Sequence, residues 1–144
     1  MNTQKDLSYF KIRLQEHLNN SFPELVTDKV FIADRALLAA QTYESAFLSG
    51  NDIYQCNNIA EIVLFESLYF SKFDSVFEVI CNEFAHLMPE EQLRPFALKM
   101  LPLCLPLFEK YALTDDFAYT YDYDSLYTEI TGAIQLWIED HHGF

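Results

Sequence analysis

Apolar side chains recur at helical spacing along most of this 144-residue chain. The first such stripe, at steps of three and four residues, is made of Leu7, Phe10, Leu14 and Leu18. Only three glycines are present. A sandwich or barrel with many tight turns needs more, whereas helices joined by short loops need few. The spacing and the glycine count together predict an all-α fold.

Capping residues and prolines divide the chain into predicted helices. We expect helices over residues 3–19, 28–49, 52–70, 71–86 and 124–140. Thr27, Asp52 and Ser71 are the expected N-caps, because a side-chain oxygen there can accept a hydrogen bond from a free backbone N–H. Gly132 lies in the middle of the last helix and predicts that another helix approaches it closely.

Three prolines interrupt the most apolar part of the chain. Pro95, Pro102 and Pro106 each remove a backbone donor and clash with the preceding turn. We therefore expect residues 89–111 to form kinked helical pieces, apolar on nearly all sides and buried at the centre. The predicted architecture is a single helical domain, residues 1–144, built as an irregular bundle of about six or seven helices around this proline-kinked segment.

Net charge limits the classes of partner. The chain has 22 acidic and 9 basic residues, and no Lys or Arg follows Lys110. Affinity for nucleic acids depends largely on cations that displace counterions from phosphates. Direct binding to DNA, RNA or an anionic membrane surface is therefore not expected.

Cysteines and apolar runs predict the compartment. Cys56, Cys81 and Cys104 are far apart, form no CxxC motif and read as buried thiols of a reducing compartment. The polar start of the chain has no secretory hydrophobic region. The longest apolar run, residues 100–108, is far shorter than the roughly 20 residues that cross a bilayer. We expect a cytoplasmic protein with no membrane segment.

Three stretches of the chain resemble a known family in combination. They are Leu7-Ser8-Tyr9-Phe10 running on to Phe31-Ile32-Ala33-Asp34-Arg35-Ala36, then Leu68-Tyr69-Phe70-Ser71-Lys72-Phe73-Asp74, and finally Leu113-Thr114-Asp115-Asp116-Phe117 with Leu126-Tyr127-Thr128-Glu129-Ile130-Thr131-Gly132. Their order and spacing resemble a family of uncharacterised helical proteins of Bacteroidetes, known only as a domain of unknown function. Its members are often encoded on conjugative transposons. The resemblance implies a helical fold and a mobile-element context, and it assigns no active site.

A carboxylate–histidine metal site is the enzyme hypothesis that the sequence offers. Glu83 and His86 form a Glu-x-x-His pattern, and Glu139 with His142 forms a second. Di-iron bundles use two such motifs and one further Glu from each of two other helices. The interpretation that we favour for these residues is that they are helix edges in contact with solvent. No EF-hand, P-loop, dinucleotide-binding or serine-hydrolase motif is present.

Tyrosines and aspartates alternate before the last predicted helix. The residues are Asp115, Asp116, Tyr119, Tyr121, Asp122, Tyr123, Asp124 and Tyr127. Tyrosine is enriched at protein interfaces, because it offers a large rigid surface with a polar tip. One interpretation is a docking surface for a partner or for a second copy of the chain, and the other is that the rings cover the core beneath a loop.

No residue pattern identifies a biochemical function. The interpretation that we favour is a non-enzymatic accessory protein, acting through protein contacts in a mobile-element setting. In its boldest form the chain is an acidic decoy, whose carboxylates imitate DNA phosphates and occupy a nucleic-acid-binding protein. A metal-dependent enzyme is the alternative. No cofactor is predicted, and a homodimer stays open.

Overall fold

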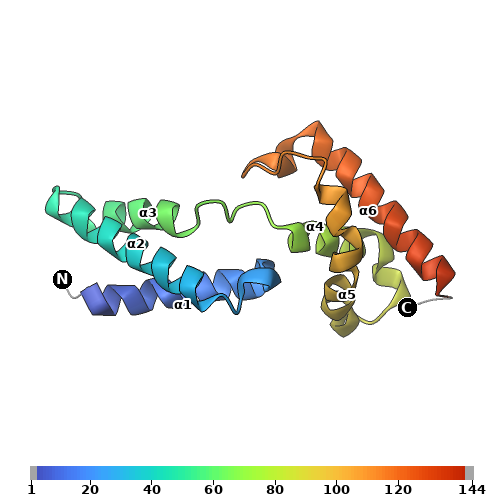
Figure 1. Ribbon diagram of the computed structural model, residues 1–144, viewed down its shortest axis with the longest axis horizontal. Helices are drawn as coiled ribbons and strands as arrows, with labels where there is room; N and C mark the ends of the chain where they lie inside the picture. The colour runs from blue at the N-terminus through green and yellow to red at the C-terminus, as the bar shows by residue number, and fades with distance from the viewer. Residues whose placement is uncertain (1–2, 142–144) are drawn as a thin grey trace. The chain divides into compact units, whose positions relative to one another are not determined.

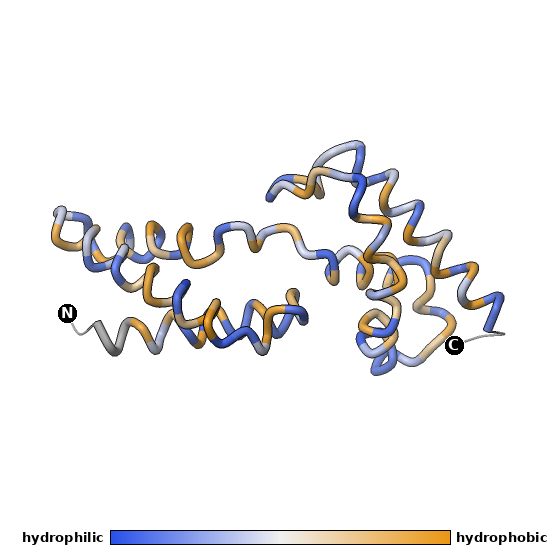
Figure 2. Tube along the Cα trace, in the orientation of Figure 1, coloured by the Kyte–Doolittle hydropathy of each residue, from blue (hydrophilic) through white to orange (hydrophobic). Residues whose placement is uncertain are grey.

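The protein is all-α. The structure, a computed structural model, describes the backbone of residues 3–141 and the side chains of residues 7–141. Within these residues it contains six α-helices, joined by short 3-10 and π-helical turns, and no strand (Figure 1). Apolar positions recur along each helix as expected from the sequence (Figure 2). The chain divides into two compact units, residues 1–68 and 69–144. The single domain that the sequence predicts, made of both units, stays a prediction.

The first unit packs three helices around alanine-rich contacts. They are α1 (Thr3–Ser21), α2 (Lys29–Leu48) and α3 (Ile53–Leu64), and α2 packs against both others. Ala36, Ala39 and Ala40 of α2 are buried, and such small side chains let neighbouring helices approach closely. Large side chains of α1, among them Phe10 and Leu14, fill the remaining core.

The end of α3 is set by an arginine from another helix. We expected this helix to continue to about residue 70, but it ends at Leu64. The Arg35 guanidinium donates to the carbonyl oxygens of Val63, Leu64 and Glu66, and the last of these distances is 2.7 Å. A cation at the carboxyl end of a helix satisfies its free carbonyls and suits its dipole. This tertiary contact explains why apolar periodicity alone overestimated the length of the helix.

The second unit contains the other three helices. They are α4 (Lys72–Val79), α5 (Glu90–Phe108) and α6 (Tyr121–Asp140), with α5 and α6 each packed against α4. The predicted helix over 71–86 is α4 followed by a π-helical turn (Ile80–Phe84) and a 3-10 turn (Ala85–Leu87). Another 3-10 turn, Phe117–Tyr119, precedes α6.

Two other helix starts differ from expectation. The N-cap of α2 is Asp28, one residue after the predicted Thr27, and its carboxylate accepts from the Phe31 N–H. The last helix begins at Tyr121, three residues before the predicted start, because the Thr120 hydroxyl caps it by accepting from the Tyr123 N–H. The predicted caps Asp52 and Ser71 are confirmed.

Helix α5 is one continuous helix that contains all three prolines. We expected separate pieces buried on nearly all sides, but Leu98, Leu103 and Leu105 are exposed. The prolines themselves also occupy exposed positions of α5. The carbonyls that lose a helical donor belong to the residues four positions earlier, on the same exposed face, where water can satisfy them. Exposure therefore makes the helix tolerate its prolines.

The cysteines lie mostly in the two cores. Cys56 and Cys104 are buried and Cys81 is half-buried, all as free thiols. Burial raises the pKa of the Cys104 thiol to about 11. The burial of Cys56 and Cys104 agrees with the prediction of buried thiols, whereas Cys81 is less buried than predicted, and the reducing compartment stays a prediction. None of the helices within residues 3–141 is long and apolar enough to cross a bilayer.

Replacing Pro102 by alanine should stabilise the protein. The Pro102→Ala variant regains the N–H that the Leu98 carbonyl lacks, and proline costs about 3 kcal/mol more than alanine inside a helix. A more flexible unfolded chain offsets about 0.4–1 kcal/mol of this gain. Because the native helix already accommodates the ring, we expect a net rise of about 1–2 kcal/mol in the free energy of unfolding, measured by urea denaturation.

Pro89→Ala is the matched control. Pro89 lies at the start of α5 with φ −65°, where proline fits without loss of a helical hydrogen bond. That substitution should lower the free energy of unfolding by about 0.4–1 kcal/mol, through the unfolded state alone. A loss of stability in Pro102→Ala would show that α5 needs the shape of the proline ring.

Candidate interaction surface

The basic side chains of the second unit contact aromatic rings of the same unit. Residues 69–144 contain thirteen acidic and four basic residues, a net charge of −9. Each of the four cations lies over an aromatic ring of the same unit, at 4.7 to 6.0 Å from the ring centroid: Lys72 over Phe108, Arg94 over Phe73, Lys99 over Trp137 and Lys110 over Tyr111. Such contacts hold the cations in place. The acidic excess is therefore left at the surface.

Tyrosine hydroxyls hold several carboxylates of this unit. Tyr123 donates to Glu78 of α4, and Tyr127 donates to Glu83 of the π-helical turn at 2.9 Å. Both tyrosines are half-buried on α6. Burial, and then the hydrogen bond to the neighbouring carboxylate, raises the pKa of both Tyr123 and Tyr127. These bonds join α6 to α4 and to the π-helical turn that follows α4.

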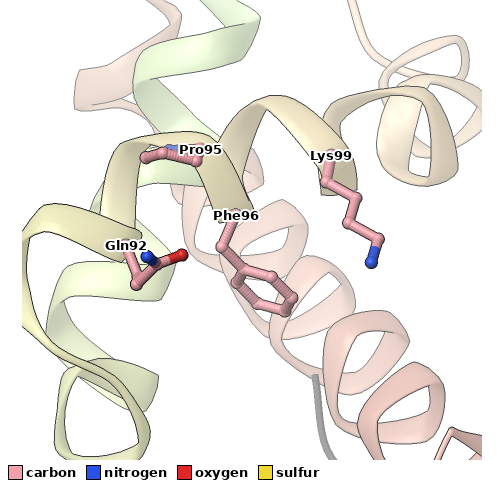
Figure 3. A pocket seen from close by; sticks show the side chains of 4 residues that line it. All are labelled: Gln92, Pro95, Phe96 and Lys99. Carbon is pink, nitrogen blue, oxygen red and sulfur yellow. The ribbon is translucent and has the colours of Figure 1, made fainter.

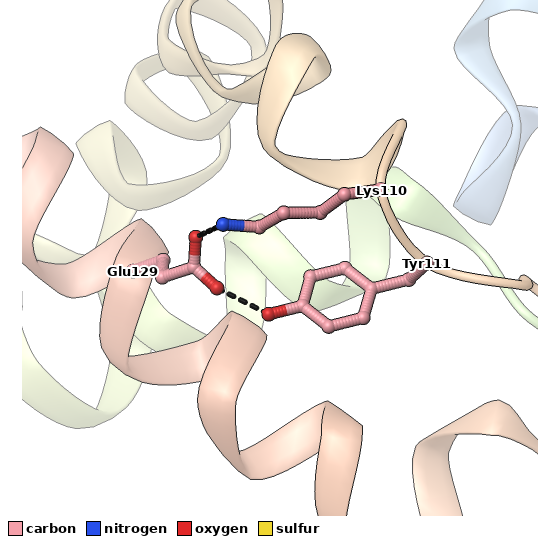
Figure 4. A network of polar contacts seen from close by, with 3 residues as sticks. All are labelled: Lys110, Tyr111 and Glu129. Carbon is pink, nitrogen blue, oxygen red and sulfur yellow. Dashed lines mark hydrogen bonds and ion pairs between the residues drawn. The ribbon is translucent and has the colours of Figure 1, made fainter.

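A third tyrosine–carboxylate pair joins the end of α5 to α6 (Figure 4). Glu129 of α6 accepts hydrogen bonds from the Lys110 ammonium and from the Tyr111 hydroxyl. The bond from Lys110 lowers the pKa of the Glu129 carboxyl most, and the bond from Tyr111 lowers it further. The bond to Glu129 raises the pKa of Tyr111 to about 12. The segment that leads out of α5 is thereby fixed against α6.

Beyond this network lies an exposed group of tyrosines and aspartates, which we call the acidic corner. It consists of Asp115, Asp116, Tyr119, Tyr121, Asp122 and Asp124, all exposed. Tyr119 and Tyr121 have 91% and 92% of their surface exposed, more than any other large hydrophobic residue described. Tyr119, Tyr121 and Asp124 line a shallow hollow together with Ala118 and Thr120.

The backbone of the acidic corner is held by a buried ring. Phe117 is buried among the rings of Phe70, Tyr111 and Tyr123, at centroid distances of 5.1 to 6.2 Å. The Tyr119 and Thr120 N–H groups donate to the carbonyls of Asp116 and Phe117, each at 3.0 Å. The chain between Phe117 and α6 is thus ordered locally, although its side chains point outward.

The structure sorts the predicted interaction residues into two groups. Tyr119, Tyr121 and the four aspartates are exposed, whereas Tyr123 and Tyr127 turn inward and hydrogen-bond to glutamates. The helical start at Tyr121 explains this separation, because residues 123 and 127 are four positions apart and share the face of α6 that packs inward. Tyr123 and Tyr127 therefore follow the interpretation in which rings cover the core, whereas a docking role for the exposed residues stays a prediction.

The predicted metal ligands occupy separate local contacts. Glu83 accepts from Tyr127, and Glu139 accepts from the Gln135 amide at 3.1 Å. His86 is exposed in the 3-10 turn before α5, and His142 lies outside the described residues. No group of three His, Cys, Asp or Glu side chains suited to a metal occurs within the described part of the chain. The metal site stays a prediction without geometric support.

Sequence reasoning missed a second hollow on α5 (Figure 3). It is lined by Gln92, Pro95, Phe96 and Lys99, whose spacing places them on one face of the helix. Phe96 also packs edge-on against Trp137 of α6, with the ring centroids 5.8 Å apart. The spacing of these residues was the available signal, but the prolines led us to expect a buried segment there.

Gly132 does not mediate a close helix contact. Apart from its chain neighbours and the nearby backbone of α6, no atom of the described residues lies within 4 Å of the position where a Cβ would stand, so the prediction of close approach is wrong. Gly132 instead lines a shallow hollow beside Glu83 and Tyr127. Its small size keeps this part of α6 open.

Comparison with known proteins gives a family and a solved relative. Residues 2–142 match the model of a family described as a domain of unknown function (DUF1896). The crystal structure of protein PG0816 from Porphyromonas gingivalis is similar, with a TM-score of 0.91 and 35% sequence identity over 97% of this chain and 95% of that chain. No curated protein matches. The resemblance noted from the sequence is confirmed for the family of unknown function.

The Tyr111–Glu129 bond should make stability fall at high pH. The folded state holds the Tyr111 proton up to a pKa of about 12, whereas tyrosine in an unfolded chain ionises near 10. The folded state binds more protons between these values, so this contribution is complete below about pH 10 and is lost as pH rises toward 12. Urea denaturation of Tyr111→Phe should show a shallower fall than the wild type across this window.

Tyr119→Phe serves as the control, because its exposed hydroxyl makes no recorded bond within residues 7–141. It should keep the wild-type dependence on pH. An unchanged dependence in Tyr111→Phe would mean that the bond to Glu129 does not persist in solution.

Proposed function

The chain belongs to the DUF1896 family, and from that premise we propose that it is a non-enzymatic accessory protein acting through contacts with another protein. The observation that carries this proposal is the acidic corner. Two tyrosine rings stand almost fully in solvent beside four exposed aspartates. Large rigid rings of this kind dominate the binding energy of many protein interfaces. The corner therefore has the composition of a contact surface.

The charge of the second unit supports a basic partner. Residues 69–144 have a net charge of −9, and no Lys or Arg follows Lys110. The four cations of the unit lie over aromatic rings and are outnumbered by its thirteen acids, so they neutralise only part of the negative charge. Complementary charge accelerates association and selects partners. Basic surfaces are typical of proteins that bind nucleic acids, since phosphates attract the same cations.

We extend this to an acidic decoy in a cytoplasmic, mobile-element setting. Asp115, Asp116, Asp122 and Asp124 would occupy a cationic surface that otherwise binds a phosphate backbone. The family resemblance supports this setting, because its members are often encoded on conjugative transposons of Bacteroidetes. A transferred element meets DNA-processing proteins of its new host in the cytoplasm. An inhibitor of such a protein would favour survival of the element.

Affinity capture tests the proposal. Tagged protein is incubated with nuclease-treated lysate of a Bacteroidetes host and washed at about 0.1 M and then about 1 M salt, which shortens the Debye length from about 10 Å to about 3 Å. We expect a basic nucleic-acid-binding protein to be released by the second wash. Substituting all four aspartates of the acidic corner by asparagine should reduce its capture about tenfold or more, since each charge pair contributes up to about 1 kcal/mol.

Glu90→Gln/Glu91→Gln is the matched control. These two acids lie in the first turn of α5, as Asp122 and Asp124 lie in the first turn of α6, so their removal has a similar effect on a helix dipole. The control should capture the partner at the wild-type level. The proposal would be contradicted if the partner stayed bound at high salt, or if it bound the asparagine variant as well as the wild type.

A further inference from the structure

We infer that the hollow in the acidic corner binds an arginine side chain of the partner. Tyr119, Tyr121 and Asp124 line this hollow, and their side chains, two almost fully exposed rings and one carboxylate, are groups that bind a guanidinium. The inference rests on the proposed function, because it assigns the chemistry by which the same surface recognises its partner. It goes further in stating that recognition depends on the shape of the cation as well as on its charge.

The polar groups that remain free in the hollow favour a cationic ligand. The Thr120 hydroxyl is already used, since it donates to the Phe117 carbonyl and accepts from the Tyr123 N–H. Thr128 donates to the main-chain carbonyl of Asp124 and leaves the carboxylate itself available. No side chain within residues 7–141 is recorded as a donor to that carboxylate. A ligand that supplies several N–H donors would complete the site.

The same set of groups already holds an arginine within this protein. Arg13 lies 5.8 Å from the ring centroids of both Tyr9 and Phe65, and its guanidinium pairs with the Glu61 carboxylate at 2.6 Å. Two rings and one carboxylate thus surround one guanidinium in the first unit. The hollow at Tyr119, Tyr121 and Asp124 presents the same groups at the surface, without a recorded cation from the chain itself to fill them.

Arginine suits such a site better than lysine. Its planar guanidinium stacks on aromatic faces and donates two parallel hydrogen bonds to a carboxylate. Lysine carries the same charge as a compact and strongly hydrated ammonium, which stacks less well. A contact made by net charge alone would bind both cations equally. Selectivity for arginine therefore separates a built site from a generally acidic surface.

The test compares two peptides of equal length and charge. One alternates glycine with arginine and the other alternates glycine with lysine, and binding of each to the full-length protein is measured by isothermal titration calorimetry. We expect the arginine peptide to bind about three- to tenfold more tightly, because stacking of an exposed cation on rings contributes about 0.5–1 kcal/mol and a bidentate pair adds to it. Tyr119→Ala/Tyr121→Ala should bring the two dissociation constants together.

Tyr54→Ala is the matched control, because that tyrosine is 76% exposed but lies in the first unit. It should preserve the preference for arginine. Asp124→Asn is a second variant that keeps both rings, and it should also reduce the preference. Circular dichroism of each variant verifies its helical content.

Equal affinities for both peptides in the wild type would overturn the arginine site. The salt-sensitive capture described above would still stand in that case, so the two proposals fail separately. A preference for arginine that survives Tyr119→Ala/Tyr121→Ala would also overturn it, since the selectivity would then arise elsewhere on the surface.

Discussion

Hydrogen bonds from tyrosine to carboxylate are the interaction on which the second unit depends. Thirteen acids and four bases in one unit leave too few cations to pair with the carboxylates between its helices. Tyr111, Tyr123 and Tyr127 supply neutral donors to three of these carboxylates instead. Of the three, Glu129 is half-buried, and without donors its carboxylate would destabilise the fold, whereas Glu78 and Glu83 are exposed. The three tyrosines thus join the helices of an acidic unit through hydrogen bonds that need no additional cation.

Apolar periodicity predicts much of this fold, and tertiary contacts decide where it fails. The stripe of Leu7, Phe10, Leu14 and Leu18 identifies α1 because every helix must bury one face. The end of α3 depends on Arg35, a residue about thirty positions earlier, and no local pattern contains that information. The continuity of α5 depends on its prolines facing solvent. Periodicity reports which residues are apolar, but it does not show which face another helix will cover.

The sequence predicted which residues make up the candidate surface, but not which of its tyrosine rings are half-buried and which are exposed. The alternation from Tyr119 to Tyr127 predicted that some rings face solvent, and two of them are nearly fully exposed. We expected an irregular chain as far as Asp124, and in such a chain alternate rings would face the same way. Thr120 caps the helix earlier, so helical spacing replaces alternation from Tyr121 onward. Recognising Thr120 as a cap was the step that would have separated the rings.

The exposed rings and the exposed charges contribute to binding in different ways. Attraction between the aspartates and a basic partner acts over a Debye length, so it guides approach and weakens with salt. Contact between a ring and a guanidinium acts only at short range, and salt affects it less because water is excluded where the two planes meet. A surface with charge alone would attract many basic proteins. In the proposed complex, Tyr119 and Tyr121 beside the aspartates would let the same corner hold one partner more tightly than the rest.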